Sequence, residues 1–134
     1  MSLEIGERER EGIRILDLDG WITAGEESIQ LRERLRELAS GGTHNVILNL
    51  RGVDYIDSTG LGTLVICFTT LSKAGGKLAL LNLSRRTIEL LVYTKLATVF
   101  EIFTDEQEAV NSYFPDRAIK RFDILDFVQQ EGKD

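Results

Sequence analysis

The chain has 134 residues, of which 43% are hydrophobic and 28% are charged, an ordinary composition for a single globular domain. Its formal net charge of -6 disfavours nucleic acid or an anionic membrane surface as a partner, because both attract basic surfaces. The lone cysteine, Cys67, cannot form an internal disulfide and is predicted to be a small buried side chain.

The first half of the chain alternates between strand and helix patterns. Residues 13–18 are predicted to form a strand that Gly20 ends, with an extra strand possible at residues 3–8. Residues 26–39 carry leucines on one helical face, and residues 46–50 are a continuous apolar run typical of a buried strand. The N-terminal residues have no apolar core of the signal-peptide kind, and the longest uninterrupted apolar stretch, at residues 64–68, is too short to span a membrane. We therefore expect a soluble, cytoplasmic protein.

The second half repeats this alternation. We expect a helix at residues 63–74, a strand at 77–83, a helix capped by Ser84 that runs to about Tyr93, a strand at 100–103, and a helix opened by Thr104 with Gln107 in the capping-box position. Such alternation predicts an α/β fold, with one mixed sheet of four to five strands covered by about four helices.

The last twenty residues follow the only proline, Pro115. Six large apolar side chains in this segment are too many for a solvated tail. We therefore expect a single domain at residues 1–114 and a C-terminal extension at residues 115–134. The extension is expected to pack on the domain or on a second copy of the chain.

The stretch at residues 57–62 reads DSTGLG and joins an apolar strand to the helix that follows. Ser58 or Thr59 can cap the helix by accepting a hydrogen bond from an amide of its first turn. The free amides and the helix dipole at the same place would also favour a phosphate on Ser58. On the residues alone, both interpretations remain open: a cap or a functional site.

Enzyme chemistry is poorly supported by the sequence. The only histidine, His44, precedes the strand at residues 46–50, whereas Ser58 follows it, and five strand residues already span about 16 Å. The glycines at 60 and 62 lack the third glycine of a dinucleotide-binding loop, and no group of His and Cys has metal-ligand spacing. We expect neither catalytic activity, nor a cofactor, nor a metal.

The stretch NLRGVDYIDSTGLGTL resembles the signature of STAS domains, the family of sulphate transporters and anti-sigma factor antagonists. The resemblance extends over residues 4–114 and includes the turn at 19–26, the link at 74–78 and the segment at 94–103. It implies a phosphorylation switch in which Ser58, or alternatively Thr59, is the regulatory phosphosite.

The resemblance further implies the partners. Unphosphorylated antagonists bind an anti-sigma factor that is a serine kinase of the GHKL type, and a PP2C-type phosphatase resets the switch. Thr23 occupies a position where many members have Asp, which leaves the choice of partner open. The partner surface implied for this chain comprises Thr23, Ala24, Asp54, Tyr55, Ile56, Asp57, Ser58, Thr59, Gly60 and Leu61.

A second function is compatible with the same resemblance. STAS domains also serve as scaffold subunits of sensory complexes and as accessory subunits of lipid transporters, where the serine need not cycle. The apolar C-terminal extension, as a potential docking element, fits this alternative.

Overall fold

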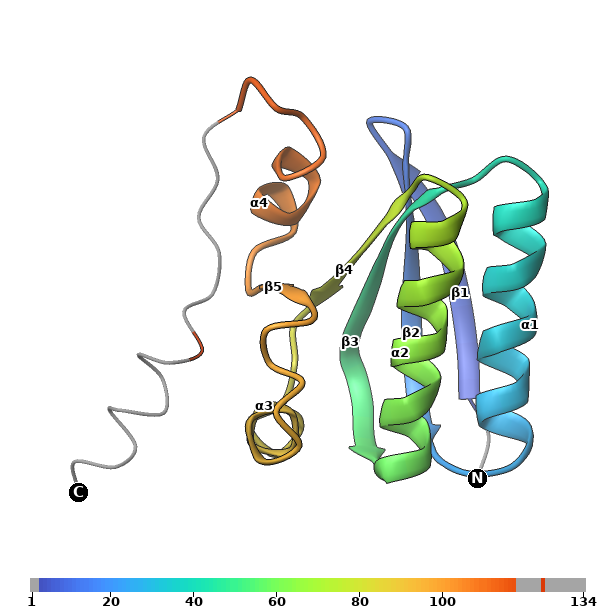
Figure 1. Cartoon of the computed structure of the whole chain (residues 1–134), viewed down its shortest axis with the longest axis vertical. Coiled ribbons are helices and arrows are strands. Elements are labelled where there is room, and N and C mark those ends of the chain that lie inside the picture. The colour runs from blue at the N-terminus through green and yellow to red at the C-terminus, as the bar shows by residue number, and fades with distance from the viewer. Residues whose placement is uncertain (1–2, 118–123, 125–134) are drawn as a thin grey trace.

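A computed structural model describes residues 3–117 and residue 124, and it shows an α/β fold of the predicted kind (Figure 1). The described residues form five strands and four helices in the predicted order, including the extra N-terminal strand. The elements are β1 (Leu3–Arg10), β2 (Ile13–Ile22), α1 (Glu26–Ser40), β3 (Asn45–Ile56), α2 (Ser58–Lys73), β4 (Lys77–Leu81), α3 (Arg85–Tyr93), β5 (Glu101–Phe103) and α4 (Glu106–Asn111).

The strands lie in the spatial order β1-β2-β3-β4-β5. β1 and β2 pair as an antiparallel hairpin, whereas all the other neighbours are parallel. Each parallel pair needs a helical crossover, and α1, α2 and α3 provide these connections. The sheet is therefore mixed, and the carboxyl ends of its central strands meet at one edge.

Both faces of the sheet are buried. Successive side chains of β3 point to opposite faces of the sheet. Leu48 belongs to the larger of two apolar clusters, and its neighbour Ile47 belongs to the smaller one. The larger cluster lies under α1 and α2, which stand side by side, α1 over β1 and β2 and α2 over β3 and β4 (Figure 1). The smaller cluster lies between the opposite face and α4, through Ala109 and Val110. This double coverage explains why the middle of β3 reads as a continuous apolar run.

Three strands are longer than the sequence predicts: β1, which runs to Arg10, and above all β2 and β3. β4 is shorter than predicted and ends at Leu81. Gly20 does not end β2: it has φ 124, lies beside a shift in register, and the strand continues to Ile22. Glycine accommodates this conformation because it has no Cβ, so the strand bends without stopping. β3 continues past Leu50 to Ile56 and pairs there with β2 through Tyr55 opposite Trp21. The apolar run in the sequence ends at Leu50 because only one face of β3 is buried over residues 51–56.

Two helix starts also differ from the prediction. α2 begins at Ser58, before the periodic segment predicted at residues 63–74, and Asp57 caps it in place of Ser58 or Thr59. α4 is capped by Asp105, whose side chain accepts a hydrogen bond from the Glu108 amide, and Thr104 lies outside the helix. In both places an aspartate holds the extended conformation that a cap requires and its carboxylate reaches the third helical amide.

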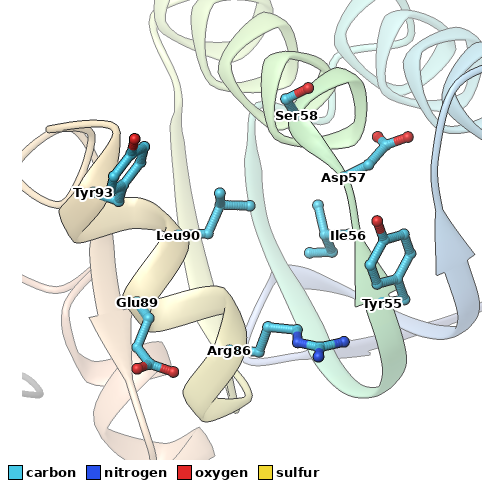
Figure 2. Close-up of a pocket in the computed structure, with 8 residues that line it drawn as sticks. All are labelled: Tyr55, Ile56, Asp57, Ser58, Arg86, Glu89, Leu90 and Tyr93. Carbon is cyan, nitrogen blue, oxygen red and sulfur yellow. The ribbon is translucent and has the colours of Figure 1, made fainter.

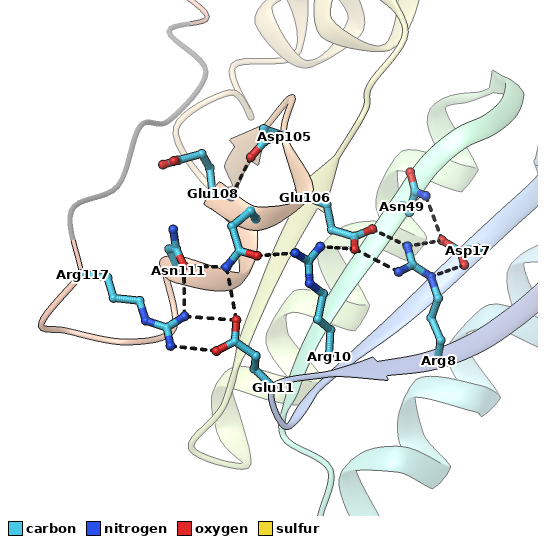
Figure 3. Close-up of polar contacts among 11 residues, drawn as sticks. Arg8, Arg10, Glu11, Asp17, Asn49, Asp105, Glu106, Glu108, Asn111 and Arg117 are labelled. Carbon is cyan, nitrogen blue, oxygen red and sulfur yellow. Dashed lines mark hydrogen bonds and ion pairs between the residues drawn. The ribbon is translucent and has the colours of Figure 1, made fainter.

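α4 is joined to the N-terminal hairpin by a polar network on the second face of the sheet (Figure 3). Arg8 of β1 binds Asp17 of β2 and Glu106 of α4, and Arg10 donates to Glu106 at 2.6 Å. Asn49 of β3 donates to Asp17 at 2.8 Å. The network links the beginning of the chain to its last described helix.

The predicted extension at residues 115–134 lies largely outside the described residues. Within its described part, the Arg117 guanidinium lies 4.1 Å from the centre of the Phe114 ring and 2.7 Å from a Glu11 oxygen. Ile124 packs against the larger apolar cluster. The boundary between a domain at 1–114 and an extension stays a prediction.

Candidate functional site

The junction between β3 and α2 is organised by Asp57. Its backbone is extended, and one carboxylate oxygen accepts a hydrogen bond from the Gly60 amide at 2.7 Å. The other oxygen accepts from the Ala24 amide at 3.3 Å, in the loop that joins β2 to α1. Asp57 therefore caps α2 and fixes the neighbouring loop beside it.

The start of α2 lies very close to the end of β2. A Cβ built on Gly60 would be 1.9 Å from the Ile22 carbonyl oxygen, a distance that no side chain tolerates. The Asp57 amide donates to the same carbonyl at 3.4 Å. Gly60 is thus needed for close packing of the helix on the strand, which accounts for a glycine that otherwise suggests a nucleotide-binding loop.

Ser58 and Thr59 are the first two helical residues and both are exposed. The prediction that one of them caps α2 is wrong, because Asp57 occupies the cap position. Among the described residues, the Ser58 hydroxyl has no hydrogen-bond partner. A chemical change at this hydroxyl would therefore break no contact within the described structure.

Ser58 lies on the rim of an open depression of about 530 Å³ (Figure 2). One wall is the end of β3, where Tyr55 makes an edge-on contact with Trp21 at 5.5 Å between ring centres. The other wall is one face of α3, on which the Tyr93 side chain is 86% exposed. The depression is lined by Tyr55, Ile56, Asp57, Ser58, Arg86, Glu89, Leu90 and Tyr93.

The ten residues predicted to form a partner surface gather around this junction but differ in exposure. Ala24, Asp54, Tyr55, Ser58 and Thr59 are exposed, and Thr23 and Asp57 are partly exposed. Ile56, Gly60 and Leu61 are buried, so these three shape the surface from below without forming its outer layer. Their role in binding a partner stays a prediction.

The wall formed by α3 was missed by sequence reasoning. Its lining residues recur at the spacing of one helical face, Arg86, Glu89, Leu90 and Tyr93. The sequence does contain this signal, as a mixed polar and aromatic stripe opposite the buried Ile88 and Leu91. What it cannot show is that the stripe faces Ser58.

The groups that an enzyme would need do not converge on Ser58. His44 precedes β3 and Ser58 follows it, and the twelve residues of this strand extend over about 40 Å. Burial raises the pKa of the Cys67 thiol to about 12, which disfavours the reactive thiolate. Within residues 3–117 and 124, no cluster of three His, Cys, Asp or Glu side chains could hold a metal ion. In the same part of the chain, no helix has the length and apolar character needed to cross a membrane.

The fold and the junction define a small α/β domain in which an exposed hydroxyl, without a partner among the described residues, lies where the central strand leads into a helix. The sequence model of the STAS domain matches residues 5–109, and the chain belongs to this family.

Individual proteins show the same relationship. An anti-sigma-B factor antagonist of Bacillus subtilis (strain 168) is 41% identical over 80 residues, which cover 60% of this chain and 72% of the relative. An anti-sigma-B factor antagonist of Staphylococcus epidermidis is 36% identical over 73 residues, which cover 54% of this chain and 68% of the relative.

Solved structures share the fold at low sequence identity. An anti-sigma factor antagonist from Mycobacterium paratuberculosis superposes with a TM-score of 0.70 at 16% identity, covering 82% of this chain and 92% of that one. The anti-sigma factor antagonist SpoIIAA in its unphosphorylated form gives a TM-score of 0.65 at 17% identity, covering 84% and 99%. The phosphorylated form of Bacillus SpoIIAA gives 0.64 at 19% identity, covering 82% and 99%.

Proposed function

We propose that this protein is an anti-sigma factor antagonist that is switched by phosphorylation of Ser58. In its unphosphorylated state it binds an anti-sigma factor, a serine kinase of the GHKL type, and thereby withdraws that factor from its sigma factor. Phosphorylation ends the binding, and a PP2C-type phosphatase restores it. The protein acts in the cytoplasm as a substrate and binding partner and catalyses no reaction itself.

The observation that carries this proposal is the state of the Ser58 hydroxyl. It is exposed on the rim of a depression, and Asp57, not Ser58, satisfies the first turn of α2. Phosphorylation would therefore leave the cap and the core unchanged. The similarity to relatives named anti-sigma-B factor antagonists supports the same function.

The chemistry of the switch follows from charge. The Ser58 oxygen attacks the γ-phosphorus of ATP, the bond to ADP breaks, and the hydroxyl proton passes to a base of the kinase. The product carries about two negative charges beside Asp57 and close in sequence to the exposed Asp54. An interface that fits a neutral hydroxyl would then have to accommodate a bulky dianion, and a loss of about 3 kcal/mol weakens binding more than a hundredfold.

The proposed partner surface consists of the exposed residues around the junction. Thr23 and Ala24 flank it on the β2–α1 side, and Asp54, Tyr55 and Thr59 surround Ser58 on the β3–α2 side. Ile56, Gly60 and Leu61 support these residues from the core.

Calorimetric titration of three variants against the cognate anti-sigma kinase tests the proposal. Ser58→Ala should stay folded and bind, whereas Ser58→Asp should stay folded and bind at least tenfold more weakly, since one carboxylate carries only part of the charge of a phosphate. Thr59→Ala is the matched control, because Thr59 is the neighbouring exposed hydroxyl, and it should bind and still be phosphorylated.

Mass spectrometry of the wild type after incubation with the kinase and ATP should place the phosphate on Ser58. Equal affinities of the alanine and aspartate variants would contradict the switch and favour a scaffold whose serine does not cycle. A phosphate on a residue other than Ser58 or Thr59 would contradict the assigned site.

A further inference from the structure

The depression beside Ser58 is closed on one side by a single face of α3. Arg86, Glu89, Leu90 and Tyr93 lie three or four positions apart along this helix and all line the depression. The opposite wall consists of Tyr55 to Ser58. A group attached to Ser58 would therefore lie between two walls, one of which carries a cation.

That cation is Arg86, and it is unpaired. Its side chain is exposed and makes no ion pair or hydrogen bond with any other described residue. Other arginines of the described chain are engaged, among them Arg8 with Asp17 and Arg34 with Glu7. The Arg86 guanidinium therefore lies, without a partner among the described residues, at a depression that also adjoins Ser58.

The orientation of the charged side chains also matters. Figure 2 shows the Arg86 guanidinium extending from α3 toward the end of β3, whereas the Glu89 carboxylate points away from it. The Asp57 carboxylate, the other anion in the lining, is held by the amides of Gly60 and Ala24. Neither carboxylate neutralises Arg86.

We propose that Arg86 is the intramolecular counter-ion of the phosphate on Ser58, which it holds across the depression between α2 and α3. This inference rests on the proposed function, in which Ser58 is the phosphorylated residue. The planar guanidinium can donate two parallel hydrogen bonds to phosphate oxygens, and such charge-assisted pairs are stronger than neutral hydrogen bonds. Phosphorylation would then place an anion in the depression and join α3 to the start of α2.

The charged groups around the site determine the electrostatic repulsion that Arg86 has to offset when it binds the phosphate. Asp57 and Glu89 would repel the phosphate, and the hydroxyls of Tyr55 and Tyr93 are the other titratable groups in the lining. Two carboxylates alone would raise the second pKa of the phosphate above its ordinary value near 6, whereas a bound guanidinium would lower it. The phosphate itself therefore reports whether Arg86 binds it.

The test installs phosphoserine at position 58 during translation, so that no kinase or partner is needed, and follows the phosphate by phosphorus NMR across a pH titration. The second pKa of the phosphate should be about 0.5 to 1 unit lower in the wild type than in Arg86→Gln. Arg36→Gln is the matched control: it removes the same charge from an exposed position on α1, and it should reproduce the wild-type pKa. The Arg86 Nε–H signal should also shift when position 58 changes from serine to phosphoserine.

An equal phosphate pKa in the wild type and Arg86→Gln, together with an unshifted Arg86 signal, would overturn the inference. Circular dichroism of each variant verifies that the exposed substitution leaves the fold intact. The outcome is independent of the partner experiment above. If the NMR shifts appear but the Ser58 variants bind the kinase equally well, the counter-ion stands and the switch fails. If the reverse is found, the switch stands without Arg86.

Discussion

Two glycines of α2 lie in different surroundings, although both belong to its first turns. Gly60 packs against the Ile22 carbonyl, whereas a Cβ on Gly62 would meet nothing within 4 Å. Gly60→Ala should lower the free energy of unfolding by about 3 kcal/mol, because backbone has to move to admit the methyl group. Urea denaturation of the purified variant measures this loss.

Gly62→Ala is the control for that substitution. It should raise the free energy of unfolding by about 0.5 to 1 kcal/mol, since alanine is favoured over glycine inside a helix. An equal effect of the two substitutions would contradict the close approach of α2 to β2.

The identity of the helix cap is a second test at the scale of single residues. Asp57→Ala should cost about 1 kcal/mol of stability, because the Gly60 amide loses its acceptor. Asp57→Asn keeps a capping oxygen and should cost less. Ser58→Ala should leave stability unchanged within about 0.5 kcal/mol. A destabilised Ser58→Ala in the same denaturation series would return the cap to Ser58.

Among the elements, α4 depends on contacts with a hairpin at the opposite end of the chain (Figure 3). Glu106 accepts hydrogen bonds from Arg8 and Arg10, and these two guanidinium groups, Arg8 above all, lower its pKa to about 2. α4 has only six residues, too few for an isolated helix to be stable. Its position therefore depends on this network and on the apolar cluster below it.

Stability should depend on Glu106 in a pH-dependent way. The carboxyl has a lower pKa in the folded protein than its ordinary value of 4.5, so its contribution is present above about pH 4.5 and is lost as the pH falls toward 2. Glu106→Gln should lower the free energy of unfolding by about 1 kcal/mol at pH 7, a value discounted for partial exposure. The difference from the wild type should disappear near pH 2.

Denaturation at a series of pH values measures this dependence. Glu33→Gln is the control, because Glu33 forms an exposed ion pair with Arg36 on α1 at 3.2 Å, and such pairs contribute little. A Glu106→Gln difference that persists unchanged to pH 2 would show that lost packing, not charge, causes the effect.

At the scale of the whole molecule, the C-terminal segment is predicted to be part of the fold. Its described contacts include the pairing of Arg117 with Glu11 and the packing of Ile124 against the larger apolar cluster. Truncation after Phe114 should lower the melting temperature or change the oligomeric state, because these contacts and six large apolar side chains are removed together.

Differential scanning calorimetry and light scattering measure the two outcomes. Ile124→Ser isolates one contact of the segment and should lower the melting temperature by a smaller amount. Unchanged melting and unchanged mass after truncation would mean that the segment is dispensable.

The order of the elements and the α/β class could be predicted from the sequence, because periodicity reports locally which side of a segment is buried. The helix at Arg85–Tyr93 and its Ser84 cap were predicted for this reason and are confirmed. The hydroxyl at a junction between strand and helix was also predictable, since the turn and cap residues at 57–60 lie between a predicted strand and a predicted helix. The exact strand ends were not, because β3 continues beyond Leu50 only through its pairing with β2.

Tertiary structure alone decided how the candidate site is built. Asp57 is the cap partly because its second oxygen meets the Ala24 amide, 33 positions earlier in the chain. The depression exists because the fold places α3 opposite the end of β3 and the start of α2, and no local pattern relates Arg86 to Ser58. Sequence periodicity records which face of each element is buried; which faces meet depends on how the sheet brings distant segments together, and that is a property of the folded chain.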